Sequence, residues 1–121
     1  MVFNSYIPCS LNFYCIIFSL FVVTQAVDVY FYEHAGRQGV YFISNANEGL
    51  CYEMHSMLND RTSSIVTPQQ MCLDVYEHGG CTGKSRHFAA GYSATIELGG
   101  TEFNDMISSY GISSRGRNGC S

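Results

Sequence analysis

Two polar hexapeptides are the segments of this chain best suited to chemistry. Residues 59–64 read Asn-Asp-Arg-Thr-Ser-Ser, and residues 104–109 read Asn-Asp-Met-Ile-Ser-Ser, 45 positions later. Each supplies an aspartate carboxylate and serine hydroxyls, and oxygen atoms of these kinds are the ligands that Ca²⁺ prefers. The hexapeptides therefore indicate calcium-binding loops, while Asn-Asp followed by serines is also ordinary turn chemistry.

Catalytic chemistry has less support in the sequence. Serine, histidine and aspartate are all present, but no Gly-x-Ser-x-Gly elbow, metalloprotease helix or phosphate-binding loop surrounds them. The four histidines are interpreted as surface or packing residues. We therefore predict that the chain is not an enzyme.

The hexapeptides belong to a longer internal repeat. Residues 32–39, Tyr-Glu-His-Ala-Gly-Arg-Gln-Gly, recur at 76–83 as Tyr-Glu-His-Gly-Gly-Cys-Thr-Gly, an offset of 44. Two unrelated signatures thus recur in the same order at nearly the same offset, which indicates a tandem duplication. The first unit covers about 27–70 and the second about 71–118.

Each unit has the pattern of four short β-strands. Runs of β-branched and aromatic residues alternate with polar residues and end in glycine-rich turns, which is typical of half-buried strands and hairpins. The predicted strands lie at 27–32, 40–43, 50–54 and 64–67 in the first unit and at 73–76, 85–88, 95–98 and 109–112 in the second. We expect an all-β fold in which two Greek-key motifs pack as an antiparallel β-sandwich.

With these features the chain resembles the βγ-crystallin family, whose domain consists of two Greek-key motifs. The resemblance rests on the paired hairpins and the paired hexapeptides, and it covers residues 27–121. The chain departs from the family pattern at the second aromatic position of each hairpin, which holds Arg37 and Cys81, and it contains no tryptophan. The lens members are cytosolic and have two domains, whereas this chain has an uncharged N-terminal segment, described below, and a single domain.

The resemblance implies two calcium ions in a clamp that both loops share. Two aspartates would give carboxylate oxygens, two serines would give hydroxyl oxygens, and the other four residues would act mainly through backbone carbonyls. This implied ligand set is Glu33, Asp60, Arg61, Ser63, Glu77, Asp105, Met106 and Ser108. The positive charge of Arg61 is unfavourable beside a cation and would make the two affinities unequal.

The first 27 residues carry no charged side chain. Within them, 15–23 is an apolar run of signal-peptide length, and Thr24 and Ala26 place small residues at −3 and −1 of a cleavage site. We predict that 1–26 is a signal peptide and that the mature protein is secreted, without stable membrane insertion. A retained anchor is the alternative, because no Lys or Arg precedes the apolar run, which is nevertheless shorter than the roughly 20 residues that span a bilayer.

Four cysteines remain after such a cleavage, namely Cys51, Cys72, Cys81 and Cys120. An even number in a small secreted chain predicts disulfides, whereas the absence of a Cys-x-x-Cys pair disfavours a zinc site. The first and fourth strands of a Greek key pair antiparallel, which favours a bond between Cys72 and Cys120. The relation of Cys51 to Cys81 stays open.

The net charge of −4 argues against nucleic acid as a partner and fits a cation better. The predicted function is that of a secreted calcium-binding structural module. Two alternatives belong to other classes: a secreted effector of similar fold, such as a killer toxin or protease inhibitor, and a subunit of a membrane-active or carbohydrate-binding assembly. The sequence identifies no protein or glycan partner.

Overall fold

The structure, a computed structural model, describes residues 26–91, 93–113 and 120. These residues form strands β1 (Val27–His34), β2 (Gln38–Ala46), β3 (Tyr52–Glu53), β4 (Ser64–Val66), β5 (Met71–His78), β6 (Thr82–Ala90), β7 (Thr95–Glu97) and β8 (Ser109–Ser113). All eight predicted strands are therefore present, although β3 is shorter than expected. The predicted signal peptide lies outside the described residues except for Ala26. In the described part of the chain no helix has the length and apolarity needed to cross a membrane.

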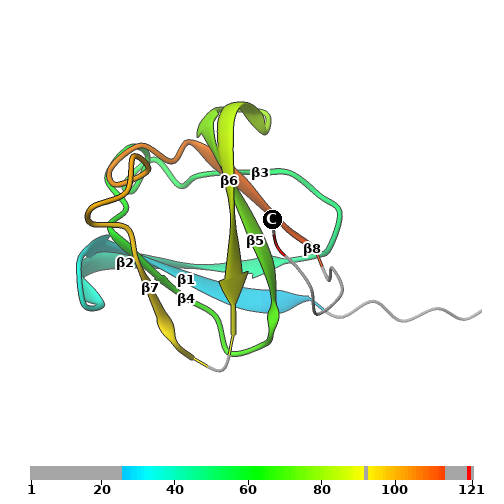
Figure 1. Cartoon of the computed structure of the whole chain (residues 1–121), viewed down its shortest axis with the longest axis horizontal. Coiled ribbons are helices and arrows are strands. Elements are labelled where there is room, and N and C mark those ends of the chain that lie inside the picture. Colours follow the sequence, from blue (N-terminus) through cyan, green and yellow to red (C-terminus); the bar gives the residue numbers. More distant parts are fainter. Residues whose placement is uncertain (1–25, 92, 114–119, 121) are drawn as a thin grey trace, which may run out of the picture.

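The strands form two four-stranded antiparallel sheets, with the orders β2-β1-β4-β7 and β3-β8-β5-β6 (Figure 1). Each sheet contains three strands of one unit and the third strand of the other. Thus β3 pairs with β8 through Tyr52↔Tyr110, and β7 pairs with β4 through Ile65↔Ile96. The predicted all-β sandwich is confirmed, and the exchange of β3 and β7 between the two units is a feature that the strand pattern alone did not predict.

The core lies between the two sheets, and β1 and β5 contribute equivalent sets of side chains to it. The inward-facing buried residues of these strands are Val27, Val29 and Phe31 in β1 and Met71, Leu73 and Val75 in β5. At the centre, the rings of Phe31 and Tyr110 lie 4.5 Å apart. Offset and tilted ring pairs add to the stability that burial alone gives, so these two aromatics fill the core without a tryptophan.

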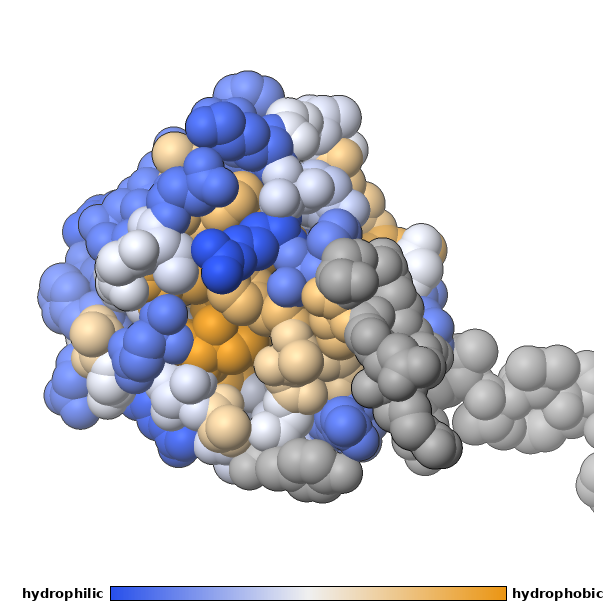
Figure 2. All heavy atoms as spheres, in the orientation of Figure 1, coloured by the Kyte–Doolittle hydropathy of each residue, from blue (hydrophilic) through white to orange (hydrophobic). Residues whose placement is uncertain are grey.

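Several apolar side chains extend the core toward the surface while staying partly exposed: Phe42, Tyr52, Phe88, Ile96 and Met106. Figure 2 shows apolar residues near the centre of one face, surrounded by hydrophilic ones. A small domain buries a limited fraction of its surface, so disulfide cross-links add to its stability.

The buried hydroxyl of Tyr110 is expected to stabilise the fold through a hydrogen bond to Ser44. It donates a hydrogen bond to Ser44 Oγ at 2.6 Å, and burial raises the pKa of this phenol. Tyr110→Phe leaves the Ser44 oxygen without its donor, and we expect a loss of about 1 to 2 kcal/mol in the free energy of unfolding. Urea denaturation measures it. The double variant Tyr110→Phe with Ser44→Ala should cost less than the sum of the two single changes; strict additivity would show that this hydrogen bond contributes nothing.

Two fully buried serines fold the β1–β2 and β5–β6 hairpins onto the sandwich. Each hydroxyl, of Ser64 or Ser109, donates to one hairpin carbonyl and accepts from one hairpin amide. The carbonyls are those of His34 and His78, at 2.7 and 2.5 Å, and the amides are those of Arg37 and Cys81, at 3.1 and 2.8 Å. The last serine of each hexapeptide therefore holds a hairpin in place.

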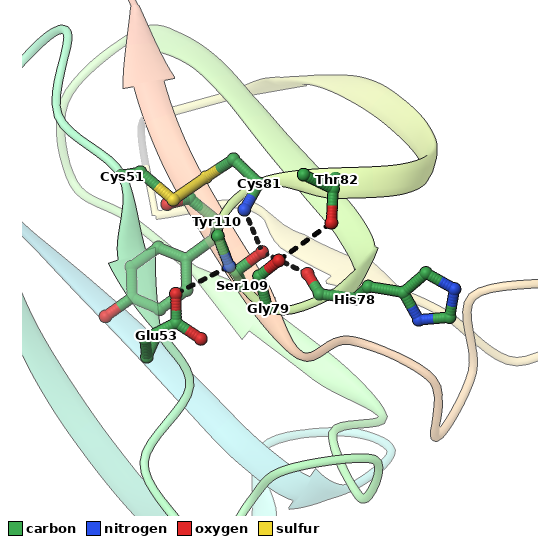
Figure 3. The surroundings of a disulfide bond; sticks show 9 residues. Cys51, Glu53, His78, Gly79, Cys81, Thr82, Ser109 and Tyr110 are labelled. Atoms are coloured by element: carbon green, nitrogen blue, oxygen red, sulfur yellow. Dashed lines mark hydrogen bonds between the residues drawn. A yellow bond between two sulfur atoms is a disulfide. The ribbon is translucent and has the colours of Figure 1, made fainter.

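The second hairpin is also tied to the exchanged strand β3. Cys51, directly before β3, forms a disulfide with Cys81, and the Gly80 amide donates to Glu53 Oε2 at 2.7 Å (Figure 3). The sequence did not show whether Cys51 and Cys81 bond to each other, because they lie 30 residues apart, in different units. Only the strand exchange brings them together.

The first hairpin is tied to β7 by hydrogen bonds instead. The Gly36 amide donates to both carboxylate oxygens of Glu97 at 3.1 Å, and Arg37 Nε donates to Thr95 Oγ1 at 2.8 Å. Arg37 and Cys81 thus replace the expected second aromatic with two different attachments, one by hydrogen bonds and one covalent.

The second disulfide joins Cys72 to Cys120, as predicted. Cys72 pairs with Ser113 at the end of β8, which places the first and last strands of the second unit side by side. Every described cysteine is therefore oxidised, and their thiolates are removed as zinc ligands.

Candidate metal centre

The two hexapeptides lie in the β3–β4 and β7–β8 connections and adopt matching conformations. Asp60 and Asp105 have positive φ values of 57° and 58°, a region that aspartate enters more readily than most residues. Each of these amides donates to the other loop: Asp60 to the Ile107 carbonyl at 3.1 Å and Asp105 to the Thr62 carbonyl at 3.0 Å. The loops are therefore held side by side by their own backbones.

This contact brings each aspartate to the serine of the opposite loop. Ser63 Oγ donates to Asp105 Oδ1 at 3.2 Å, and Ser108 Oγ donates to Asp60 Oδ1 at 3.1 Å. Both aspartates are exposed to solvent, and both serines are partly buried. Two equivalent oxygen clusters result, each built from both loops.

The hairpin glutamates lie next to these clusters. The Ser63 amide donates to the carbonyl of Tyr32, the residue before Glu33, at 2.9 Å. The second unit repeats this contact with Ser108, Tyr76 and Glu77, at 3.0 Å. Each hairpin thereby supplies a third segment beside its loop.

We define the first site as Glu33, Arg61, Ser63 and Asp105, and the second site as Glu77, Met106, Ser108 and Asp60. Together they contain all eight predicted site residues. A hollow of about 250 Å³ lies at the first site, lined by its four members with His34 and Asp60. The repeat relates Met106 to Arg61 and Glu77 to Glu33.

The donor atoms fit a hard, oxygen-seeking cation. Within the described ranges, no hydrogen-bond donor contacts the carbonyl oxygen of Arg61 or of Met106. No described group of three or more His, Cys, Asp or Glu side chains could hold a metal by itself. A cation here would depend on a mixture of carboxylate, hydroxyl and carbonyl oxygens, which suits Ca²⁺ rather than zinc.

A cationic side chain already occupies part of the first site. Arg61 Nη2 lies 2.6 Å from Glu33 Oε2, so its side chain turns toward the hairpin. The pKa of Glu33 is lowered chiefly by the hydrogen bond from the Val40 amide, with a further contribution from Arg61, while desolvation opposes the shift. Glu33 is therefore a carboxylate at neutral pH, paired with Arg61.

The roles of Glu53 and Glu97, whose carboxylates hold the two hairpins, were not predicted from the sequence. Their separation of 44 residues equals the offset of the hairpin repeat and was a usable signal. The Arg61–Glu33 ion pair was not predicted either, because the sequence does not show in which direction a side chain points.

No family profile and no curated protein matches the chain by sequence. Solved structures match it over most of its length. A structure from work on the evolution of the eye-lens βγ-crystallin domain fold has a TM-score of 0.61 and 21% identity, covering 79% of this chain and 94% of that one. A βγ-crystallin from an archaeon has a TM-score of 0.56 and 25% identity, with coverages of 71% and 96%. A βγ-crystallin domain from Clostridium beijerinckii has a TM-score of 0.56 and 26% identity, with coverages of 73% and 99%.

By its fold, the chain is a βγ-crystallin domain. Its departures from the family pattern, Arg37 and Cys81, are accounted for by the hairpin attachments described above. In this βγ-crystallin both hairpins keep their folded form without the second aromatic ring.

Proposed function

We propose that this βγ-crystallin is a secreted structural module that binds two Ca²⁺ ions between its paired loops. The observation that carries the proposal is the crossed pairing of Asp60 with Ser108 and of Asp105 with Ser63. In each pair a serine hydroxyl and an aspartate carboxylate from distant segments lie about 3 Å apart. Oxygen atoms this close together could bind the same cation.

Serine hydroxyls and backbone carbonyls of the two loops would add ligands to those of the aspartates. The Ser63 and Ser108 hydroxyls, which now donate to carboxylates, would rotate and present their lone pairs. The carbonyls of Arg61 and Met106 carry no competing hydrogen bond from the described residues. Water would complete the usual six to eight ligands, about half of the total. A bound cation would neutralise the aspartates and cross-link the loops.

The secreted location is supported by two features. Both disulfides require an oxidising environment to form and persist, which is typical of extracellular proteins. The uncharged leader ends in a suitable cleavage site after Ala26.

A calorimetric titration of residues 27–121 with calcium chloride tests the proposal. We expect binding of two ions per chain, and we expect Asp60→Ala combined with Asp105→Ala to abolish it. Each substitution removes a carboxylate from one loop without altering the core. An absence of binding heat at millimolar calcium, confirmed by unchanged amide chemical shifts, would refute calcium binding.

The alternative function, a secreted effector, is not specifically supported by the loop that was expected for it. Its expected feature was a disulfide-fixed loop at Cys81, and that loop is present. However, the same loop bonds to Ser109 and Glu53 and so has a clear role in the fold.

A further inference from the structure

The two candidate sites have the same oxygen donors but differ in charge. Each contains one aspartate and one hairpin glutamate, so the carboxylates balance. The first site additionally holds the guanidinium of Arg61, 2.6 Å from Glu33, whereas its repeat position in the second site is Met106. The net charge of the four residues is therefore −1 at the first site and −2 at the second.

Other charged neighbours do not cancel this difference. His34 Nε2 lies 3.6 Å from Glu33, and His78 Nε2 lies 3.6 Å from Glu77, so the histidines affect both sites alike. Lys84 lies next to the second hairpin, and its backbone amide donates to Glu77. Its ammonium is paired with Glu102 at 3.4 Å, so this pair adds no net charge to the second site.

The geometry of Arg61 makes its effect direct. The same residue supplies a candidate carbonyl ligand and a side chain that bonds to Glu33, so in the ion-free protein its charge lies within the site. The Glu33 side chain is only 17% exposed, while that of Arg61 is 61% exposed. Solvent therefore weakens the repulsion of an incoming cation without removing it.

We propose, on the basis of the calcium function above, that Arg61 sets the order in which the two sites fill. The second site binds first and more tightly. The first site binds only as the guanidinium leaves Glu33, and in the ion-free protein Arg61 takes the place of a cation by holding the hairpin to the loop. The duplicated domain thus has one high-affinity site and one that responds at higher calcium.

Exchanging the two repeat-related side chains tests this order. Calcium titrations followed through the Ser63 and Ser108 amide resonances report the two sites separately. In the parent protein we expect the Ser108 signal to shift at about three- to tenfold lower calcium than the Ser63 signal, the size of effect of one partly exposed charge. Arg61→Met should bring the two midpoints together, and Met106→Arg should raise the Ser108 midpoint.

Two further variants separate charge from shape. Arg61→Lys keeps the charge and should preserve the unequal midpoints. Arg86→Met removes one positive charge from β6, where Arg86 lies over the ring of Phe88, and should leave their ratio unchanged. Equal midpoints in the parent, or a ratio that Arg61→Met does not alter, would overturn the inference while leaving calcium binding intact. If neither amide responds in the parent or in Arg61→Met, both the inference and the proposed function are wrong.

Discussion

Saturating calcium is expected to raise the melting temperature of the mature domain by about 10 to 20 °C over its value in chelator. A ligand that binds only the folded state adds about 1.4 kcal/mol per site at tenfold above its Kd, which is about 2.8 kcal/mol for two sites. In a domain of this size, 1 kcal/mol shifts the midpoint by roughly 4 to 8 °C. Because calcium would join the β3–β4 loop to the β7–β8 loop, it would oppose separation of the two Greek keys. Thermal unfolding followed by circular dichroism measures the shift.

The crossed pairing determines the choice of variants for that experiment. Asp60→Ala and Asp105→Ala should each reduce the calcium-dependent shift by about half, because each removes a carboxylate from a different site. Asp28→Ala is the matched control, since it removes a carboxylate that bonds to Asn45 on β2, away from both loops. Identical melting curves in chelator and in millimolar calcium would mean that the hexapeptides are only turns.

Removal of the Cys51–Cys81 disulfide is the change with the second large expected effect. The bond spans 30 residues and joins two units, so its loss should cost about 3 to 4 kcal/mol through the entropy of the unfolded chain. We therefore expect Cys51→Ser with Cys81→Ser to lower the melting temperature by more than about 10 °C.

The effect should also be local, because the same bond holds the second hairpin. The remaining attachments of that hairpin include the hydrogen bonds from Gly80 to Glu53, from Cys81 to Ser109 and from Ser109 to His78. Hydrogen exchange in residues 78–82 should accelerate more than in the first hairpin. Cys72→Ser with Cys120→Ser is the control, since it removes a disulfide away from the hairpin. Equal exchange rates in both double variants would show that the bond does not hold the hairpin.

The sequence favoured the pairing of Cys72 with Cys120 through the expected Greek-key topology, and by itself it determined the fold class and the duplication. These depend on local patterns: strand alternation, turn glycines and two signatures that recur at fixed offsets. The residues of both candidate sites were also predicted, through the family resemblance, because the hexapeptides keep their order and spacing.

Only the tertiary structure decided which sheet each short strand joins. β3 has two paired residues and β7 has three, so neither carries enough local pattern to select a partner, and the packing of the whole sandwich assigns them to the opposite unit. Two other features depend on that assignment or on side-chain direction: the Cys51–Cys81 bond and the Arg61–Glu33 ion pair. Such contacts between residues about 30 positions apart form because the folded backbone brings their segments together, and no local propensity encodes that distance.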